Sequence, residues 1–555
     1  MAATARTSAF IFMVSMMSVK PRVVLPATRA VPQEPSKSRE PTKSTYQRRS
    51  LLQSSLLIGG SSTVWTGPSF ALSLDDGARD GQLEGQLERR VSEFTLANGM
   101  HFIVARREAF PVVSFHTYAD VGAFDEPDGK TGMAHFLEHL AFKGSPNIGS
   151  KNFEKEQAIL EAMDDVFYSI LDSRSGREEA AMERQLDRLA SQAADLSIPN
   201  AYGSLLQRQG AVGLNAVTTH DSTRYFCSLP SNKIELWFAM ESERFQVPIF
   251  RDFYTEKKVI LEERRLRVDN APLGPFQERF ASLSLQNNYK RPVIGYEHDL
   301  KRLGRRDVAE FFQSFYGPDS ITIAIVGDVD PEHVQRLAEK YFGPWQKGVL
   351  SRPPCGASPL PPADADPKAR RFDDRSRAGP ALLRAYDRPC LGQDPSMSVA
   401  LDAVNDLLTG SRTSRLYANL VLGGSALSVS SFATFPGEKH PCQMVIYGIP
   451  APGVAIEELD EMIGRELADL ASQGPTPSEL RRYSKAARMG ALDVVTSNAS
   501  LAAALASYHC LMGSWREVYR DLERVDALTP QDVAHAVSLV LTPDNSFVGY
   551  VSRLA

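Results

Sequence analysis

Three ionisable side chains, His135, Glu138 and His139, stand in the otherwise apolar stretch TGMAHFLEHLAFKGS, which begins at residue 131. On a helix these positions are i, i+3 and i+4, so the two imidazoles and the carboxylate project from one face. Each buried charge would cost roughly several kcal/mol if nothing compensated it. Two neutral imidazoles one helical turn apart can share a tetrahedral zinc ion, which supplies that compensation. We therefore interpret the stretch as a metal-binding helix, whereas a lone histidine here would be a hydrogen-bonded core residue.

The elements around this helix mix strands with helices. Asn98 and Gly99 form a hairpin turn between the alternating strands of FTLANGMHFIVARR, and VVSFHTYADVG is a third strand before the helix. Residues 213–229, GLNAVTTHDSTRYFCSL, are a further hairpin-like strand segment, and residues 255–267, TEKKVILEERRLR, are a helix. This order predicts an α+β fold, a sandwich with a sheet on one side and helices on the other.

An internal repeat indicates two homologous α/β sandwich halves. The segment LGRRDVAEFFQSFYGPDSITIAIVG, from Leu303, aligns without gaps with LTPQDVAHAVSLVLTPDNSFVGYVS, from Leu528. In both, Asp-Val-Ala opens an amphipathic helix, Pro-Asp turns the chain and a β-branched strand follows. The Pro-rich stretch 351–367 can form neither a helix nor a central strand. We predict a first, zinc-binding domain at 91–346, a linker at 347–384 and a homologous inactive-half domain at 385–555.

A helical hairpin interrupts the first half at about residues 157–197. Two apolar stripes at helical spacing predict its two helices: Ile159, Met163, Val166 and Ile170, then Met182, Leu186, Leu189, Ala193 and Leu196. Ser175 and Glu178 are spaced as a capping box at the turn between them. We interpret the insertion as a solvated antiparallel arm, and a dedicated partner-binding site is the alternative.

The composition excludes several classes of protein. With 23% charged residues and a net charge of −5, the chain has no basic excess that would indicate nucleic-acid binding. No apolar run reaches the ~18 residues of a membrane span, so we expect no transmembrane segment. The five cysteines are scattered without any CxxC spacing, and they predict neither a disulfide framework nor a cysteine metal site.

Residues 1–74 have the composition of a targeting peptide, with nine basic residues and two acidic ones among many Ser, Thr and Ala. This predicts a chloroplast transit peptide. Arg48 and Arg49, followed by a mildly apolar stretch and the small residues Ser69 and Ala71, predict a second, twin-arginine signal for the thylakoid lumen. One long transit peptide without the second signal, mitochondrial import and secretion are the alternatives.

Five segments together resemble one known family. GMAHFLEHLAFKGS, GLNAVTTHDSTRY, VILEERRLRVDN, RPVIGYEHDLKRL and TIAIVGDVDPEHV occur in the order found in the pitrilysin/insulinase metallopeptidases. The HxxEH arrangement of these enzymes is the inverted zincin motif. The resemblance extends from about Val91 to the C-terminus, and it is closest to the bacterial-type two-domain members related to mitochondrial processing peptidase. It implies a zinc-dependent peptide hydrolase with Zn²⁺ as its cofactor.

The resemblance also implies the third metal ligand. In the family this ligand is a glutamate on a later helix, preceded seven residues earlier by another glutamate, and Glu263 and Glu256 match this pattern. Seven residues are two helical turns, so both carboxylates share a face. Glu263 is thus expected on the metal and Glu256 behind a ligand histidine. Glu262 competes for the ligand position but points elsewhere.

A family-like mechanism follows from this ligand set. Two histidines and one glutamate leave a zinc position open for water, and Glu138 is placed as the general base. An extended peptide substrate would lie along an exposed strand edge, for which GLNAVTTHD, with Asn215 and Ala216, is the candidate. An ordinary hairpin edge is the structural alternative for these two residues.

The second half departs from the family pattern. Family members carry an arginine and a tyrosine after the SRLY motif, and these reach the substrate carbonyl at the zinc. Here Val421 and Leu427 occupy the matching places, and neither can donate a hydrogen bond. The sequence thus favours a zinc-bearing peptidase that needs a related partner subunit to supply the Arg and Tyr. The rival interpretation is a catalytically weak or silent subunit, like the core proteins of a respiratory complex.

Overall fold

The computed structural model describes residues 81–173, 175–346, 370–376 and 378–553. The described residues from Leu83 onward form one compact unit. The predicted targeting peptide, residues 1–74, and the Pro-rich stretch 351–367 lie outside the described residues, so both stay predictions.

The first half is built on a mixed sheet with the order β1-β2-β6-β3-β5-β4 among the described residues. Its strands are β1 (Val91–Thr95), β2 (His101–Arg106), β3 (Val112–Ala119), β4 (Val212–Thr218), β5 (Thr223–Pro230) and β6 (Ile321–Gly327). β1 and β2 pair as the expected hairpin, and Gly99 at its turn has a φ of 97°, which suits glycine. β2 runs parallel to β6, and β3 runs antiparallel to both β5 and β6. β4 lies at the edge, beside β5.

Helices cover both faces of this sheet. Those of the first half are α2 (Gly81–Arg90), α3 (Met133–Leu140), α4 (Phe153–Asp172), α5 (Gly176–Leu196), α6 (Ala201–Arg208), α7 (Ile234–Gln246), α8 (Phe253–Arg264), α9 (Gly274–Ser284), α10 (Glu297–Arg302), α11 (Arg305–Phe315) and α12 (Pro331–Phe342). β6 is buried along its whole length. Ile323 and Ile325 point into the core shared with the first-half helices, whereas Ala324 and Val326 pack against α16 (Asn498–Met512) of the second half. The sheet is therefore covered on the face that the sequence analysis left open.

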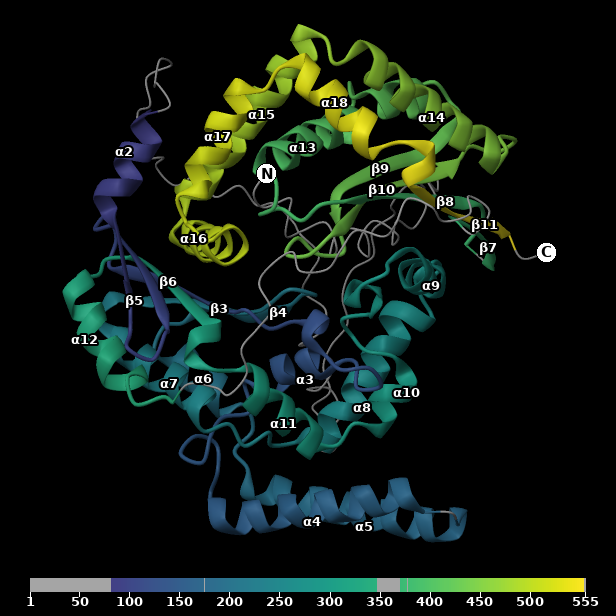
Figure 1. The fold of residues 1–555 in the computed structure, drawn as a ribbon. Helices are drawn as coiled ribbons and strands as arrows, with labels where there is room; N and C mark the ends of the chain where they lie inside the picture. Colours follow the sequence, from purple (N-terminus) through teal and green to yellow (C-terminus); the bar gives the residue numbers. More distant parts are fainter. Residues whose placement is uncertain (1–80, 174, 347–369, 377, 554–555) are drawn as a thin grey trace, which may run out of the picture. The chain divides into compact units, whose positions relative to one another are not determined.

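The inserted arm is a pair of long helices, α4 and α5, which lie side by side (Figure 1). Its base is tied to the rest of the first half by buried polar contacts: Asp164 accepts hydrogen bonds from Tyr254 and Arg305. The expected capping box is wrong. Ser175 is the residue before α5, but its side chain makes no capping hydrogen bond. The backbone N–H of Ser175 instead bonds to Ser173 Oγ, which fixes the turn in another way.

The second half repeats the arrangement of the first. Its strands are β7 (Arg371–Ser376), β8 (Ala381–Arg388), β9 (Ala426–Phe435), β10 (Cys442–Pro450) and β11 (Ser546–Arg553), in the order β7-β11-β8-β10-β9 among the described residues (Figure 1). Its other helices are α13 (Pro395–Thr409), α14 (Ile456–Gln473), α15 (Pro477–Thr496), α17 (Glu517–Ala527) and α18 (Pro530–Val540). β11 is parallel to β7 and antiparallel to β8, as β6 is to β2 and β3. The sequence repeat thus occupies the same place in both sheets, which confirms the two-half α/β fold.

Part of the range expected as linker is strand. Residues 371–376 form β7, and β8 begins at residue 381. The sequence RFDDRS did not indicate a strand because it forms a charged edge strand in which only Phe372 is buried. Its structure comes from parallel pairing with β11, which lies far away in the sequence. The second half therefore begins earlier than residue 385.

Among the described residues, no single helix combines the length and apolar character needed to cross a membrane. α15 and α16 together pass that test by length and composition alone, with a bend of 113° between them.

Candidate metal centre

A buried carboxylate accepts hydrogen bonds at the N-terminus of the helix that carries the HxxEH motif. Glu126 accepts hydrogen bonds from the backbone N–H groups of Gly132 (2.7 Å) and Ala134 (2.8 Å), which would otherwise be unpaired at the start of α3. Burial raises the pKa of Glu126 to about 8. Gly132 has a φ of 95°, and a Cβ on it would come within 2.9 Å of the carbonyl oxygen of Ile294. Both features fix the start of α3 relative to its surroundings.

The three predicted ligands converge. His139 Nε2 lies 3.5 Å and His135 Nε2 lies 3.8 Å from the same oxygen, Glu263 Oε2. Ligand atoms that sit 2.0–2.1 Å from a tetrahedral zinc ion are about 3.4 Å apart. The two imidazole rings are nearly perpendicular, with centroids 4.8 Å apart. The donor set and its spacing therefore fit a zinc ion.

Arg267 holds the other oxygen of Glu263. Its Nη1 lies 2.6 Å from Glu263 Oε1, one turn further along the chain. Arg267 belongs to a π-helical turn, Arg265–Asp269, that continues α8. Sequence analysis did not assign a role to Arg267, although the i, i+4 spacing of a glutamate and an arginine indicates such a pair. Glu262, the competing candidate, pairs with Arg265 at the protein surface.

Glu256 lies behind His139, where the sequence placed it. Its Oε2 is 3.2 Å from His139 Nδ1, so His139 turns its Nε2 towards Glu263. Lys143 donates to Glu256 Oε1 over 2.7 Å and lies 3.4 Å from Asp252. This lysine follows the motif in the sequence, but nothing in the local pattern indicated its contact with α8. A carboxylate that orients a ligand histidine in this way is common at zinc sites.

The electrostatics of the cluster favour a bound cation. Burial lowers the pKa of His135 to about 4, so this imidazole is neutral near pH 7. Burial also opposes protonation of His139, yet the carboxylates of Glu256 and Glu263 raise its pKa to about 9. For Glu263, burial acts to raise the pKa, but the two imidazoles and Arg267 lower it to about 2. Two carboxylates therefore surround the imidazoles and attract positive charge to this point.

Glu138 lies next to the edge strand β4. Burial raises its pKa, and the neighbouring Thr218 of β4 and His139 oppose that rise. On the same strand, Asn215 is exposed and Ala216 is buried, and among the described residues their register partners are on β5 alone. The register of β4 shifts between Val212 and Asn215. The exposed edge of β4 therefore lies next to Glu138, the residue expected to act as the general base.

The second half carries no matching donors at the two positions singled out. Val421 lies on a π-helical turn, Tyr417–Leu422, and packs against the second core. Leu427, on β9, is 61% exposed. Both side chains are hydrocarbon, so neither position offers a hydrogen bond to a substrate carbonyl.

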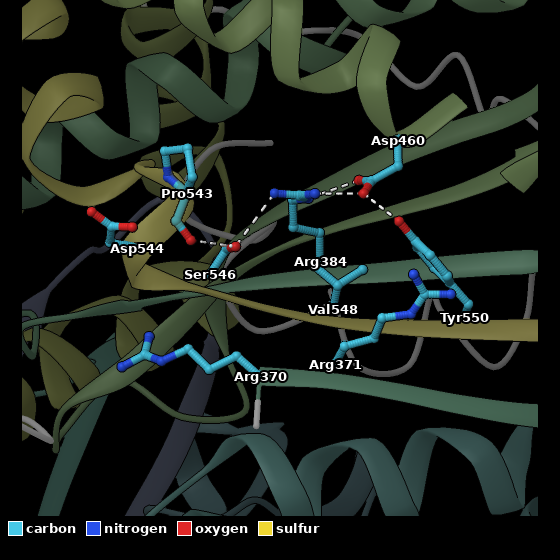
Figure 2. Close-up of a pocket in the computed structure, with 9 residues that line it drawn as sticks. All are labelled: Arg370, Arg371, Arg384, Asp460, Pro543, Asp544, Ser546, Val548 and Tyr550. Carbon is cyan, nitrogen blue, oxygen red and sulfur yellow. Dashed lines mark hydrogen bonds and ion pairs between the residues drawn. The ribbon is translucent and has the colours of Figure 1, made fainter. Parts of the chain in front are cut away.

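The second half contains a small pocket of about 140 Å³ (Figure 2). Its central carboxylate, Asp460, accepts two hydrogen bonds from Arg384 and one from Tyr550. Arg371 stacks over the Tyr550 ring. Arg384 and Asp460 pair with each other where α14 meets the sheet, and we assign the pocket no function.

The fold and the site together define a class of protein: a two-half α+β protein with a His-His-Glu centre on an inverted zincin motif. Two separate regions of the chain resemble the insulinase family, peptidase family M16. Residues 103–171 match the model "Insulinase (Peptidase family M16)", and residues 302–486 match "Peptidase M16 inactive domain". The first match contains His135, Glu138 and His139, whereas Glu263 falls between the two matched regions.

Individual relatives agree with this family. The "Zinc protease PqqE" of Helicobacter pylori is 24% identical over 418 residues, which are 75% of this chain and 82% of that protein. The "Probable mitochondrial-processing peptidase subunit beta" of Schizosaccharomyces pombe is 23% identical over 249 residues, 45% of this chain and 44% of that one. The crystal structure of a protease from Helicobacter pylori has the same fold, with a TM-score of 0.69 and 21% identity, covering 83% of this chain and 99% of that chain.

Proposed function

We propose that the protein is a zinc metalloendopeptidase that hydrolyses peptides or unfolded polypeptide segments. The observation that carries this proposal is the convergence of His135 Nε2 and His139 Nε2 on Glu263 Oε2. Glu256 supports it because it orients His139. Relatives named zinc proteases support the same class of activity.

His135, His139 and Glu263 would hold the zinc ion, which when bound supplies a Lewis acid for the scissile carbonyl and the attacking water. Glu138 accepts a proton from the attacking water and later donates it to the leaving amine. A substrate main chain pairs with the edge of β4 at Asn215 and Ala216, which places the peptide next to Glu138. The chain itself forms no covalent bond with the substrate.

Glu138→Gln tests this assignment. The variant keeps the three metal-binding side chains, so it should bind zinc in the same amount as the unmodified chain but cleave an unstructured peptide at least about 100-fold more slowly. Zinc is measured by atomic absorption and cleavage by the release of a quenched fluorophore. Glu262→Gln is the matched control and should retain both properties. A metal-free chain, or equal cleavage by Glu138→Gln, would overturn the proposal.

A second candidate function is that of a weak or silent subunit in a heteromeric complex. Val421 and Leu427 favour it, since the family positions for the substrate-binding Arg and Tyr hold hydrocarbon side chains. Some relatives are named as subunits of mitochondrial processing peptidase. The test mixes the purified chain with a related chain that carries this Arg and Tyr. A partner-dependent enzyme gains activity, whereas full activity of the chain alone argues against any need for a partner.

We also propose import into the chloroplast, with the thylakoid lumen as the final compartment. The basic composition of residues 1–74 and the twin arginines Arg48 and Arg49 support it. Fusion of residues 1–74 to a fluorescent protein tests the route, and Arg48→Lys with Arg49→Lys should retain the fusion in the stroma. Mitochondrial or secreted fluorescence would contradict the proposal.

A further inference from the structure

A second cluster of metal-ligating side chains joins the two halves at the other face of the first sheet. Glu93 on β1 and His101 on β2 meet His509 on α16, and one potential ligand atom of each lies within 4.8 Å of the other two. Because Thr95 pairs with His101 in the register of β1 and β2, Glu93 and His101 share the face that α16 covers. The first-half sheet and a second-half helix therefore both contribute to this cluster.

One buried ring nitrogen of each histidine in this cluster lacks an ordinary partner among the described residues. His101 Nε2 and His509 Nδ1 are buried and have no hydrogen-bond partner among the described residues. Glu93 Oε2 lies 3.5 Å from His101 Nε2, beyond the 2.7–3.2 Å of a usual N–H···O hydrogen bond. That distance equals the 3.5 Å between His139 Nε2 and Glu263 Oε2 at the first centre. It is also a separation that two ligands of one tetrahedral ion can have.

The carboxylate is presented in the same way at both clusters. Arg516 Nη1 lies 2.7 Å from Glu93 Oε1 and leaves Oε2 facing the imidazole, as Arg267 does with Glu263. His101 Nδ1 is 2.9 Å from the hydroxyl of Thr95, which fixes the ring. Outer contacts of this kind orient ligand side chains in known metal sites.

The imidazole rings of His101 and His509 are stacked, with centroids 4.0 Å apart and planes within 6° of parallel. A neutral imidazole can bind a metal ion through one ring nitrogen.

We propose that Glu93, His101 and His509 form a second metal site, specific for a borderline divalent transition ion such as Zn²⁺, that joins the sheet of the first half to α16 of the second. Two imidazoles and one carboxylate suit such an ion better than Mg²⁺ or Ca²⁺. A metal ion lies close to the plane of each imidazole that binds it, so the stacked rings must splay when the ion enters. This cost makes the second site weaker than the first. Its role is structural, since it links the halves away from the peptidase centre.

The experiment removes the first centre so that the two sites cannot be confused. The full chain carrying His135→Ala and His139→Ala is titrated with zinc by calorimetry. One saturable site is expected, and adding His509→Gln or His101→Gln should weaken it at least about tenfold. His535→Gln, at an exposed helix position outside the cluster, is the control and should change nothing. Zinc should also raise the thermal unfolding midpoint of the double variant, but not once His509 is replaced.

A second measurement uses Co²⁺ and requires no substitution in the proposed site. Co²⁺ added to the His135→Ala, His139→Ala chain should give a saturable visible absorption band of nitrogen-ligated cobalt. The proposal is overturned if neither metal binds this chain, or if binding survives both glutamine substitutions. Because the peptidase ligands are already absent, either result is independent of the proposed catalytic function.

Discussion

Arg267 Nη1 lies 2.6 Å from Glu263 Oε1, and this ion pair turns the opposite oxygen of Glu263 towards both imidazoles. The Arg267 side chain is 65% exposed, so the ion pair itself contributes little to folding stability. The ion pair instead restricts the orientation of Glu263. A carboxylate held at one oxygen loses less conformational freedom when a metal binds through its other oxygen.

Arg267→Ala should therefore weaken zinc binding about tenfold with little change in the thermal unfolding midpoint. The dissociation constant is measured by competition with a chromophoric chelator. Arg265→Ala is the matched control, since Arg265 pairs with the surface residue Glu262 and should leave zinc affinity unchanged. Equal affinities of the two variants would show that Arg267 does not position Glu263.

Glu256→Gln should lower zinc affinity or turnover by about 10- to 100-fold. The substitution weakens the contact of residue 256 with His139 Nδ1 and removes the negative charge that faces Lys143. His139 then loses the carboxylate that orients it. Metal content and peptide cleavage are measured together, and Glu262→Gln again serves as the control. Unchanged metal content and turnover in Glu256→Gln would assign Glu256 to α8 packing alone.

The residues of the candidate site could be proposed from the sequence because they follow local rules. His135, Glu138 and His139 share one turn, and Glu256 and Glu263 share one helical face, so spacing and the family pattern singled out side chains that the structure brings together. Their roles in metal binding and catalysis stay predictions. Lys143 and Arg267 were missed, since their roles appear only once α3 and α8 are packed together. The same limit applies to the fold: β7 and the covering of the first sheet by α16 arise from contacts between distant segments. Hydrophobic periodicity carries no information about such partners.

Asp164 should contribute strongly to stability at the base of the inserted arm. It is buried and accepts hydrogen bonds from Tyr254, on the helix that carries Glu256 and Glu263, and from Arg305. Asp164→Ala leaves the largely buried guanidinium of Arg305 without its partner, so the free energy of unfolding should fall by about 3 kcal/mol. Urea denaturation measures this loss. The neighbouring Asp165 is exposed and pairs with Arg306, and Asp165→Ala should cost less than about 1 kcal/mol. Similar losses in the two variants would contradict a buried role for Asp164.

His116 should make the fold sensitive to acid. It lies on β3, stacks on Phe226, and burial lowers its pKa to about 3. In the unfolded chain the same histidine takes up a proton below about pH 6.5, so protonation favours unfolding as the pH falls from 6.5 towards 3. The stabilising effect of the neutral ring is complete above pH 6.5 and is lost below it.

As the pH falls from 6.5 towards 3, the free energy of unfolding of the unmodified chain should fall up to about 1.4 kcal/mol per pH unit more steeply than that of His116→Gln. Denaturation curves between pH 7 and pH 4.5 measure the difference in slope. Other buried histidines titrate in both proteins and cancel in the comparison. Parallel curves would therefore mean that His116 has the same pKa in the native and unfolded states.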